Sequence, residues 1–199
     1  MFGRYVRSVA STMLAITMIS GSMAICGAQS HDDHHPGTPQ PQTMTAQDNL
    51  LVQKVREATM RFKDVTSIAG PGNGYGLAFG CVSGGDFGAM GLHYVNMDLV
   101  ADGEVNENFP EIILFEPAKN GTIKITGVDF LVYADTWKAI HGENAAPPML
   151  RGQLFHYFES PNRFGLPAFY TLHVWAWKDN PNGTFVNWNP GVSCNRFSQ

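Results

Sequence analysis

The sequence has few cysteines, few charged residues and none of the common catalytic signatures. Only three of its 199 residues are cysteine, and 15% are charged. It contains no GxSxG, HExxH or P-loop motif, and its glycine-rich segment 70–76 precedes a predicted strand instead of a helix. No internal repeat is present. These absences argue against the α/β-hydrolases, the zincins, the P-loop nucleotidases and the repeat proteins.

Basic residues are also scarce. The 13 Lys and Arg residues are outnumbered by 17 Asp and Glu residues, which gives a formal net charge of −4. Arg4 and Arg7 are the only charged residues before position 29, so the chain without its first 28 residues carries a net charge of −6. An acidic chain repels polyanions. We therefore expect neither nucleic acid nor an anionic membrane surface as a partner.

The longest hydrophobic run lies near the amino terminus. Two arginines precede the apolar stretch 9–23, and small residues surround Ala28. This layout predicts a secretory signal peptide over residues 1–28, and hence a secreted or periplasmic protein. The run is too short and too interrupted for a membrane span. Processing as a lipoprotein at Cys26 is a weaker alternative, because Ile25 precedes it where a small residue is preferred.

Two cysteines, Cys81 and Cys194, remain after the predicted signal peptide. In an oxidising compartment an isolated pair of this kind favours a disulfide bond. In the chain-entropy model, a loop of more than a hundred residues contributes up to ~4–5 kcal/mol of stability. The alternative, a thiolate metal site, lacks any CxxC spacing.

Residues 29–44 contain three prolines, three histidines and almost no apolar surface. They predict a disordered tail, because such a segment cannot offset the entropy lost on ordering. Cleavage after Ala28 would place His31 third from a free amine, which is a square-planar arrangement suited to Cu(II) or Ni(II). His34 and His35 add further donors. The alternative is a histidine-rich spacer without a metal.

The folded part begins at Thr45. Thr45 and Asp48 have the spacing of a capping box, with Asp48 in place of the usual Glu. Apolar residues then recur at helical spacing from Leu51 to Phe62, which predicts a helix over 46–64. A short helix over 136–141 is expected after Asp135. Runs typical of strands follow the first helix, at 76–82, 90–96, 111–116, 122–132, 153–158 and 169–177.

The connections between these strands are mostly too short for crossover helices, which favours antiparallel pairing. We therefore expect an α+β fold over residues 45–199, with one amino-terminal amphipathic helix packed on a curved, mainly antiparallel sheet. A small β-sandwich or jelly roll is the alternative.

Three histidines fall inside predicted strands among apolar neighbours: His93, His156 and His173. Buried imidazoles are costly unless their nitrogens find partners. Two carboxylates, Glu116 and Asp129, also lie in strands. Convergence of these side chains would form a site for Zn, Mn or Fe, with Glu116 as the favoured carboxylate. No HxH or HxxxH spacing supports this, and each histidine alone is also explained as a hydrogen-bonded core residue.

The last third of the chain is rich in aromatic residues. A hydrophobic core explains most of them, and a pocket for a flat small molecule is the alternative. The segments GAMGLHYVN (88–96), LFEP (114–117), LPAFYTLHVWAWKDNPNGTF (166–185) and WNPGVSC (188–194) resemble a group of small secreted bacterial proteins without an established activity. That resemblance implies secretion and a single domain.

Three functions are consistent with the sequence. The first is a secreted domain that binds a metal ion or a small ligand through a His/carboxylate pocket. The second is a metal-dependent hydrolase or oxygenase that uses the same residues, with a metal-bound water as nucleophile. The third is a structural or interaction protein whose histidines belong to the core.

Overall fold

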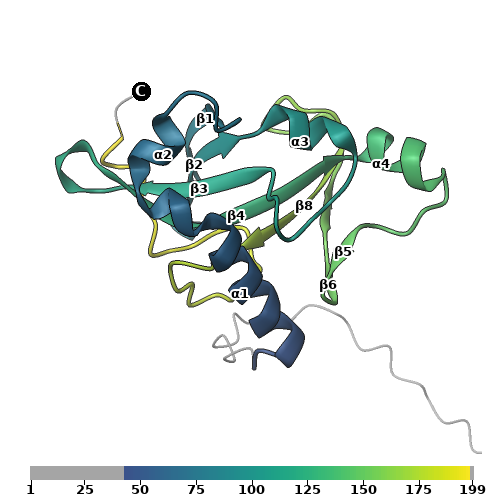
Figure 1. Ribbon diagram of the computed structural model, residues 1–199, viewed down its shortest axis with the longest axis horizontal. Helices are drawn as coiled ribbons and strands as arrows, with labels where there is room; N and C mark the ends of the chain where they lie inside the picture. Colours follow the sequence, from purple (N-terminus) through teal and green to yellow (C-terminus); the bar gives the residue numbers. More distant parts are fainter. Residues whose placement is uncertain (1–42, 198–199) are drawn as a thin grey trace, which may run out of the picture. The chain divides into compact units, whose positions relative to one another are not determined.

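A six-stranded sheet organises residues 43–197, the part of the chain that the computed structural model describes (Figure 1). The strand order is β1-β2-β3-β4-β8-β7, and each neighbouring pair is antiparallel. The strands are β1 (Gly76–Ser83), β2 (Ala89–Val95), β3 (Ile112–Pro117), β4 (Ile123–Tyr133), β7 (His156–Phe158) and β8 (Phe169–Val174). A separate hairpin joins β5 (Met149–Leu150) to β6 (Gln153–Leu154). The predicted combination of helices with a mainly antiparallel sheet is confirmed.

The helical segments lie between and before these strands. They are α1 (Ala46–Thr59), η1 (Met60–Lys63), α2 (Val65–Ala69), η2 (Gly85–Phe87), α3 (Met97–Asp102), η3 (Lys119–Gly121) and α4 (Ala134–His141). At the start of α1, the Asp48 amide donates to Thr45 Oγ1 and the Thr45 amide donates to the Asp48 carboxylate. This reciprocal capping satisfies two amides that a helix otherwise leaves unpaired. Within residues 43–197, no helix combines the length and the apolar character that crossing a membrane requires.

One face of the sheet forms the larger hydrophobic core with α1 (Figure 1). Leu51 and Val55 of α1 are fully buried there. The sheet contributes alternate residues of its central strands, among them Leu92, Ile113, Phe115, Val128, Phe130, Leu172 and Val174. Burying a side chain of this size stabilises a fold by about 1.5–3 kcal/mol. This face therefore provides a rigid support for the strands that carry the candidate site.

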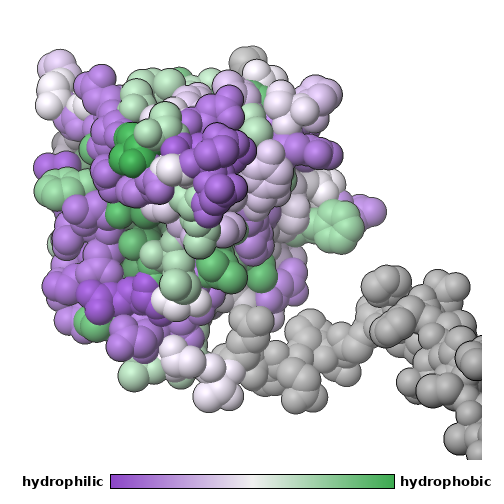
Figure 2. Space-filling view, turned by 90° about the vertical axis from the view of Figure 1, so that its right-hand side faces the viewer, coloured by the Kyte–Doolittle hydropathy of each residue, from purple (hydrophilic) through white to green (hydrophobic). Residues whose placement is uncertain are grey.

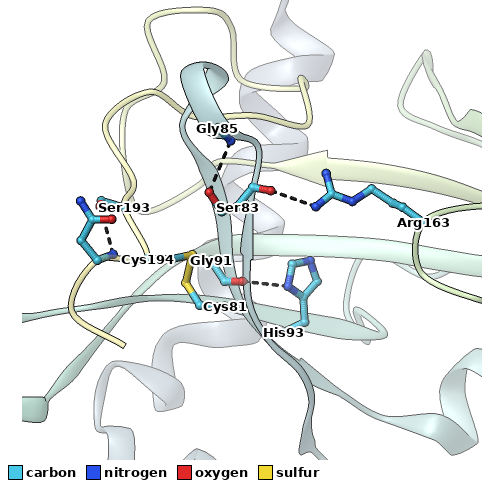
Figure 3. Close-up of a disulfide and its surroundings, with 9 residues drawn as sticks. Cys81, Ser83, Gly85, Gly91, His93, Arg163, Ser193 and Cys194 are labelled. Atoms are coloured by element: carbon cyan, nitrogen blue, oxygen red, sulfur yellow. Dashed lines mark hydrogen bonds between the residues drawn. A yellow bond between two sulfur atoms is a disulfide. The ribbon is translucent and has the colours of Figure 1, made fainter. Parts of the chain in front are cut away.

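The opposite face carries a second apolar cluster that includes Ile112, Leu114, Leu131 and Phe169. Among the described helices, α3 alone contributes to this cluster, through Val100. Side chains from the connection between β7 and β8, Phe164 and Leu166, cover it together with Phe79 and Phe158, and Arg163 of the same connection donates to the Ser83 carbonyl (Figure 3). The candidate site lies on this loop-covered face.

The carboxyl-terminal segment is fastened to the sheet by the predicted disulfide. Cys81 of β1 is bonded to Cys194, with Cα atoms 5.6 Å apart, and this confirms the prediction (Figure 3). The backbones of Ala89 and Asn189 form a two-way bridge. Trp175 Nε1 donates to the Val186 carbonyl at 2.6 Å. Residues 186–194 are therefore held next to β1, β2 and the end of β8.

Several element boundaries differ from the sequence-based expectation. The expected strand 153–158 is divided, because the Phe155 amide donates to the Pro148 carbonyl and leaves the ladder. The expected strand 169–177 ends at Val174, since the Trp175 amide donates to Thr184. The helix expected over 136–141 is α4, which begins earlier, at Ala134. Asp135 therefore lies in its first turn and does not cap it. Regular helix ends at Thr59 instead of residue 64 and continues as a 3₁₀ turn.

Two short helices, α2 and α3, were not expected from the sequence. Asn96 caps α3 by accepting hydrogen bonds from the amides of Asp98 and Leu99, and Gly103 ends the helix in the left-handed conformation. Asn96 and Gly103 are residue types that commonly mark helix ends. The sequence therefore contained the boundary signals of α3, but the helix between them has only 6 residues.

The signal peptide predicted over 1–28 and the tail histidines His31, His34 and His35 lie outside the described residues.

Among the described residues, large apolar side chains that remain exposed come from several segments, and Figure 2 shows apolar residues lying among polar ones on one face. They are Met60, Leu77, Phe87, Met97, Phe109, Ile140, Met149, Leu154 and Tyr157. Exposed apolar residues of this kind are normal on protein surfaces.

Candidate metal centre

Three polar side chains converge on the loop-covered face of the sheet: His93 from β2, Asp129 from β4 and His173 from β8. The pairing of β4 with β8 places Asp129 directly opposite His173. One donor atom from each of the three residues lies within 4.8 Å of the donor atoms of the other two. The residues are 5%, 4% and 2% exposed. Such a group is unusual inside an apolar cluster, where polar atoms need partners.

His93 is oriented by a hydrogen bond within its own strand. Its Nδ1 lies 3.0 Å from the carbonyl oxygen of Gly91, which can only accept (Figure 3). In the neutral ring Nδ1 therefore carries the proton, and Nε2 carries the lone pair that a metal requires. Burial, followed by the nearby His173, lowers the pKa of His93 to about 4. The ring is neutral at neutral pH.

His173 is the least satisfied residue of the group. Both of its ring nitrogens are buried and make no hydrogen bond within residues 43–197. Its Nδ1 lies 3.3 Å from Asp129 Oδ1, but the two groups are not aligned as donor and acceptor. Burial, followed by the charge of His156, lowers the pKa of His173 to about 3. An unpaired buried polar group costs about 1–3 kcal/mol, so this ring requires an explanation.

The contact between His173 and Asp129 has the spacing of two ligands on one ion. Bonds of about 2.0–2.1 Å to a tetrahedral zinc place neighbouring donor atoms roughly 3.3 Å apart. That is the separation of Nδ1 and Oδ1. A donor atom of His93 lies within 4.8 Å of the donor atoms of these two residues. The donors therefore need only side-chain adjustments on a fixed sheet to reach coordination distance.

Asp129 has a supporting hydrogen bond of its own. Thr171 Oγ1, two residues before His173 on β8, donates to Asp129 Oδ1. Burial raises the pKa of Asp129 to about 7, against the opposing effects of the Thr171 hydrogen bond and of His93. A divalent cation beside this carboxylate would compensate the charge that burial disfavours. Supporting hydrogen bonds of this type fix ligands in known metal sites.

The three side chains line a cavity of about 30 Å³. Its polar lining consists of His93, Asp129, Thr171, His173 and Asn187. The remaining lining is apolar: Phe79, Val82, Met90, Ile112, Leu131, Phe158, Phe164, Leu166 and Phe169. A space of this size holds about one or two water molecules, or an ion with one small ligand.

Comparison of this chain with known proteins gave no match. No family model matches it, and no curated protein or solved structure is significantly similar to it. The function is therefore inferred from the chemistry of these residues.

Two of the residues proposed from the sequence lie outside the group. Glu116 accepts a hydrogen bond from Lys178 Nζ at 2.7 Å and lines a separate surface groove. It lies four residues along β3 from Ile112, which pairs with Asp129, so about 13 Å of strand separates the two positions. His156 pairs with Thr171 in register but is exposed on the edge strand β7. The structure thus joins His93, Asp129 and His173 and leaves Glu116 and His156 apart.

Sequence reasoning did not assign a role to Thr171, Gly91 or Asn187. Thr171 shares the alternating face of His173, so strand periodicity carried a signal for it. Gly91 has a φ of +96° that no sequence pattern reveals. Asn187 lies in a turn-rich segment far from the strands in sequence, and only the fold brings it to the cavity.

Proposed function

We propose that this protein binds one divalent transition-metal ion between His93, Asp129 and His173. The observation that carries the proposal is the buried His173 ring, whose two nitrogens lack any partner within the described residues while one lies 3.3 Å from a carboxylate oxygen. Depressed pKa values keep both imidazoles neutral, which is the form that binds metals. The ion would supply the missing partner and the missing positive charge.

The donor types favour Zn²⁺, Fe²⁺ or Mn²⁺. Two imidazoles and one carboxylate form a mixed nitrogen and oxygen set that suits these ions. Cu⁺ prefers thiolate or thioether ligands, and the two cysteines of the described residues are bonded to each other. Copper is instead an expectation for the tail histidines His31, His34 and His35, as a second and separate site.

The cavity supports a metal-binding role more strongly than a hydrolase or oxygenase role. An enzyme of either class needs an accessible position for its substrate next to the metal. The 30 Å³ cavity accommodates one or two water molecules, and the three side chains are almost completely buried. We therefore propose a closed site that stabilises the domain or holds the ion.

We also propose that the protein works in an oxidising compartment. The disulfide between Cys81 and Cys194 fits such a compartment. Together with the signal peptide expected over residues 1–28 and the resemblance to small secreted bacterial proteins, it supports secretion or a periplasmic location.

A zinc titration of defined variants tests the proposal. His31, His34 and His35 are first replaced by Ala, so that only the domain contributes. We expect this chain to bind one Zn²⁺. His173→Gln and Asp129→Asn should each weaken binding at least about tenfold, roughly 1.4 kcal/mol. His141→Gln is the matched control, because His141 lies at the exposed end of α4 and contacts the Gly103 carbonyl. Absence of stoichiometric zinc, or equal losses in the control, would reject the site.

A further inference from the structure

A fourth polar side chain reaches the same cavity from the carboxyl-terminal segment. Four buried side-chain atoms lack hydrogen-bond partners among residues 43–197: Thr126 Oγ1, the two ring nitrogens of His173, and Asn187 Oδ1. Asn187 lines the cavity together with His173, whereas Thr126 does not. Buried unpaired polar atoms are rare in native proteins and each calls for a partner. Two unsatisfied residues on one small cavity indicate a shared partner.

The position of Asn187 is fixed from both sides. On one side, the Val186 carbonyl accepts a hydrogen bond from Trp175 Nε1. On the other, Asn189 is fully buried and exchanges backbone hydrogen bonds with Ala89 of β2. Asn189 Nδ2 also donates to the Asp179 carbonyl. Asn187 therefore lies between two anchored residues, Val186 and Asn189.

The same contacts lead us to expect Asn187 on the side of the cavity that His173 lines. Trp175 follows His173 by two residues on the same face, and the two rings are 6.2 Å apart. Trp175 donates a hydrogen bond to the Val186 carbonyl, and Asn187 is the next residue along the chain. Phe158, Phe164 and Phe169, which also line the cavity, come from β7, the connection between β7 and β8, and β8.

We propose that Asn187 supplies its side-chain oxygen as the fourth protein ligand of the metal. This inference rests on the proposed function, since it completes the same site. With Asn187 the donor set becomes two nitrogens and two oxygens, all from the protein. Four protein ligands are typical of closed structural sites, whereas three and a solvent molecule are typical of catalytic ones. An amide oxygen is neutral and hard, which further favours Zn²⁺, Fe²⁺ or Mn²⁺ over Cu⁺.

The experiment compares two substitutions at Asn187 in the full chain with His31, His34 and His35 replaced by Ala. Asn187→Leu keeps approximate size but removes the donor, and Asn187→Asp keeps an oxygen. Thr126→Val is the matched control, because it removes the other unpaired buried oxygen away from the cavity. Zn²⁺ affinity is measured by competition with a coloured chelator. The visible spectrum of the Co²⁺ form reports the ligand set, and unfolding of the metal-free forms checks folding.

We expect Asn187→Leu to weaken Zn²⁺ binding roughly tenfold or more and to change the Co²⁺ spectrum. Asn187→Asp should bind at least as tightly as the parent, and Thr126→Val should bind equally. Unchanged affinity and spectrum in Asn187→Leu would overturn the inference while leaving the three-residue site intact. If Asn187→Leu does not fold, Asn187→Asp decides: weaker binding than the parent overturns the inference. Failure of the parent chain to bind, or full binding by His173→Gln, would instead reject the proposed function.

Discussion

Gly91 positions His93 through its own backbone. Its φ is +96°, a conformation that L side chains rarely adopt, and a Cβ at this position would lie 2.3 Å from the Phe115 carbonyl oxygen. The Gly91 carbonyl accepts the hydrogen bond that fixes the His93 ring. A single glycine thus connects sheet geometry to the orientation of a metal ligand.

Gly91→Ala should therefore destabilise the protein strongly. We expect a loss of about 2 kcal/mol or more in the free energy of unfolding, from backbone strain together with the clash against β3. The control is Gly121→Ala, where φ is +69° but no atom lies within 4 Å of the added Cβ. Urea unfolding measures both. Equal losses in the two variants would show that the close approach to Phe115 is unimportant.

Burial determines the protonation state of the Glu111 side chain. It is 2% exposed, and its carboxylate accepts from the Leu131 amide. Burial raises its pKa to about 9 from 4.5. The folded protein therefore keeps a proton that the unfolded chain releases above pH 4.5. The stability that this retained proton contributes is fully present below pH 4.5 and is lost as the pH rises toward 9.

Glu111→Gln should consequently flatten the decline of stability between about pH 7.5 and 9. In this window the parent chain should lose up to ~1.4 kcal/mol per pH unit for one retained proton. Glutamine still accepts from Leu131 but does not titrate. Urea unfolding at a series of pH values gives the two slopes. Parallel slopes for parent and variant would contradict a proton held on Glu111.

The pairing of β4 with β8 is the element that builds the site. Register places Asp129 opposite His173 and puts Thr171 on the same face, two residues away. The three positions are therefore coupled through one pair of strands. Thr171 donates to Asp129, and this hydrogen bond restrains the carboxylate before any ligand arrives.

Thr171→Val tests that coupling. The substitution preserves shape and β-branching but removes the donor to Asp129. We expect Zn²⁺ affinity to fall by about tenfold, as for other supporting residues of metal sites. Thr122→Val is the control, since the Thr122 hydroxyl donates to the exposed Lys119 carbonyl. An affinity unchanged by Thr171→Val would mean that Asp129 is oriented by the sheet alone.

Local periodicity was sufficient to predict parts of this arrangement but not the choice of carboxylate. Alternation along the strands placed His93 and His173 on buried faces, because side-chain direction repeats every two residues. Distinguishing Asp129 from Glu116 required the register between strands, and it required Lys178, whose ion pair with Glu116 depends on a distant segment. Asn187 reaches the cavity for the same non-local reason.

At the scale of the whole molecule, the two faces of the sheet have different roles. The face against α1 is a continuous apolar core, whereas the opposite face is covered by loops and encloses a polar group within an apolar cluster. The disulfide from Cys81 to Cys194 and the bridge from Ala89 to Asn189 hold the last segment over that second face. A bound ion there would join β2, β4 and β8 through their side chains.

Diffraction from crystals of the zinc-saturated protein, recorded at the zinc absorption edge, tests the metal site most directly. We expect one anomalous peak in the cavity, at about 2.0–2.2 Å from His93 Nε2, a carboxylate oxygen of Asp129 and a ring nitrogen of His173. Crystals of His173→Gln should lack the peak under the same conditions. A cavity that contains only water in zinc-saturated crystals, with no anomalous signal near these three residues, would contradict the proposed metal centre.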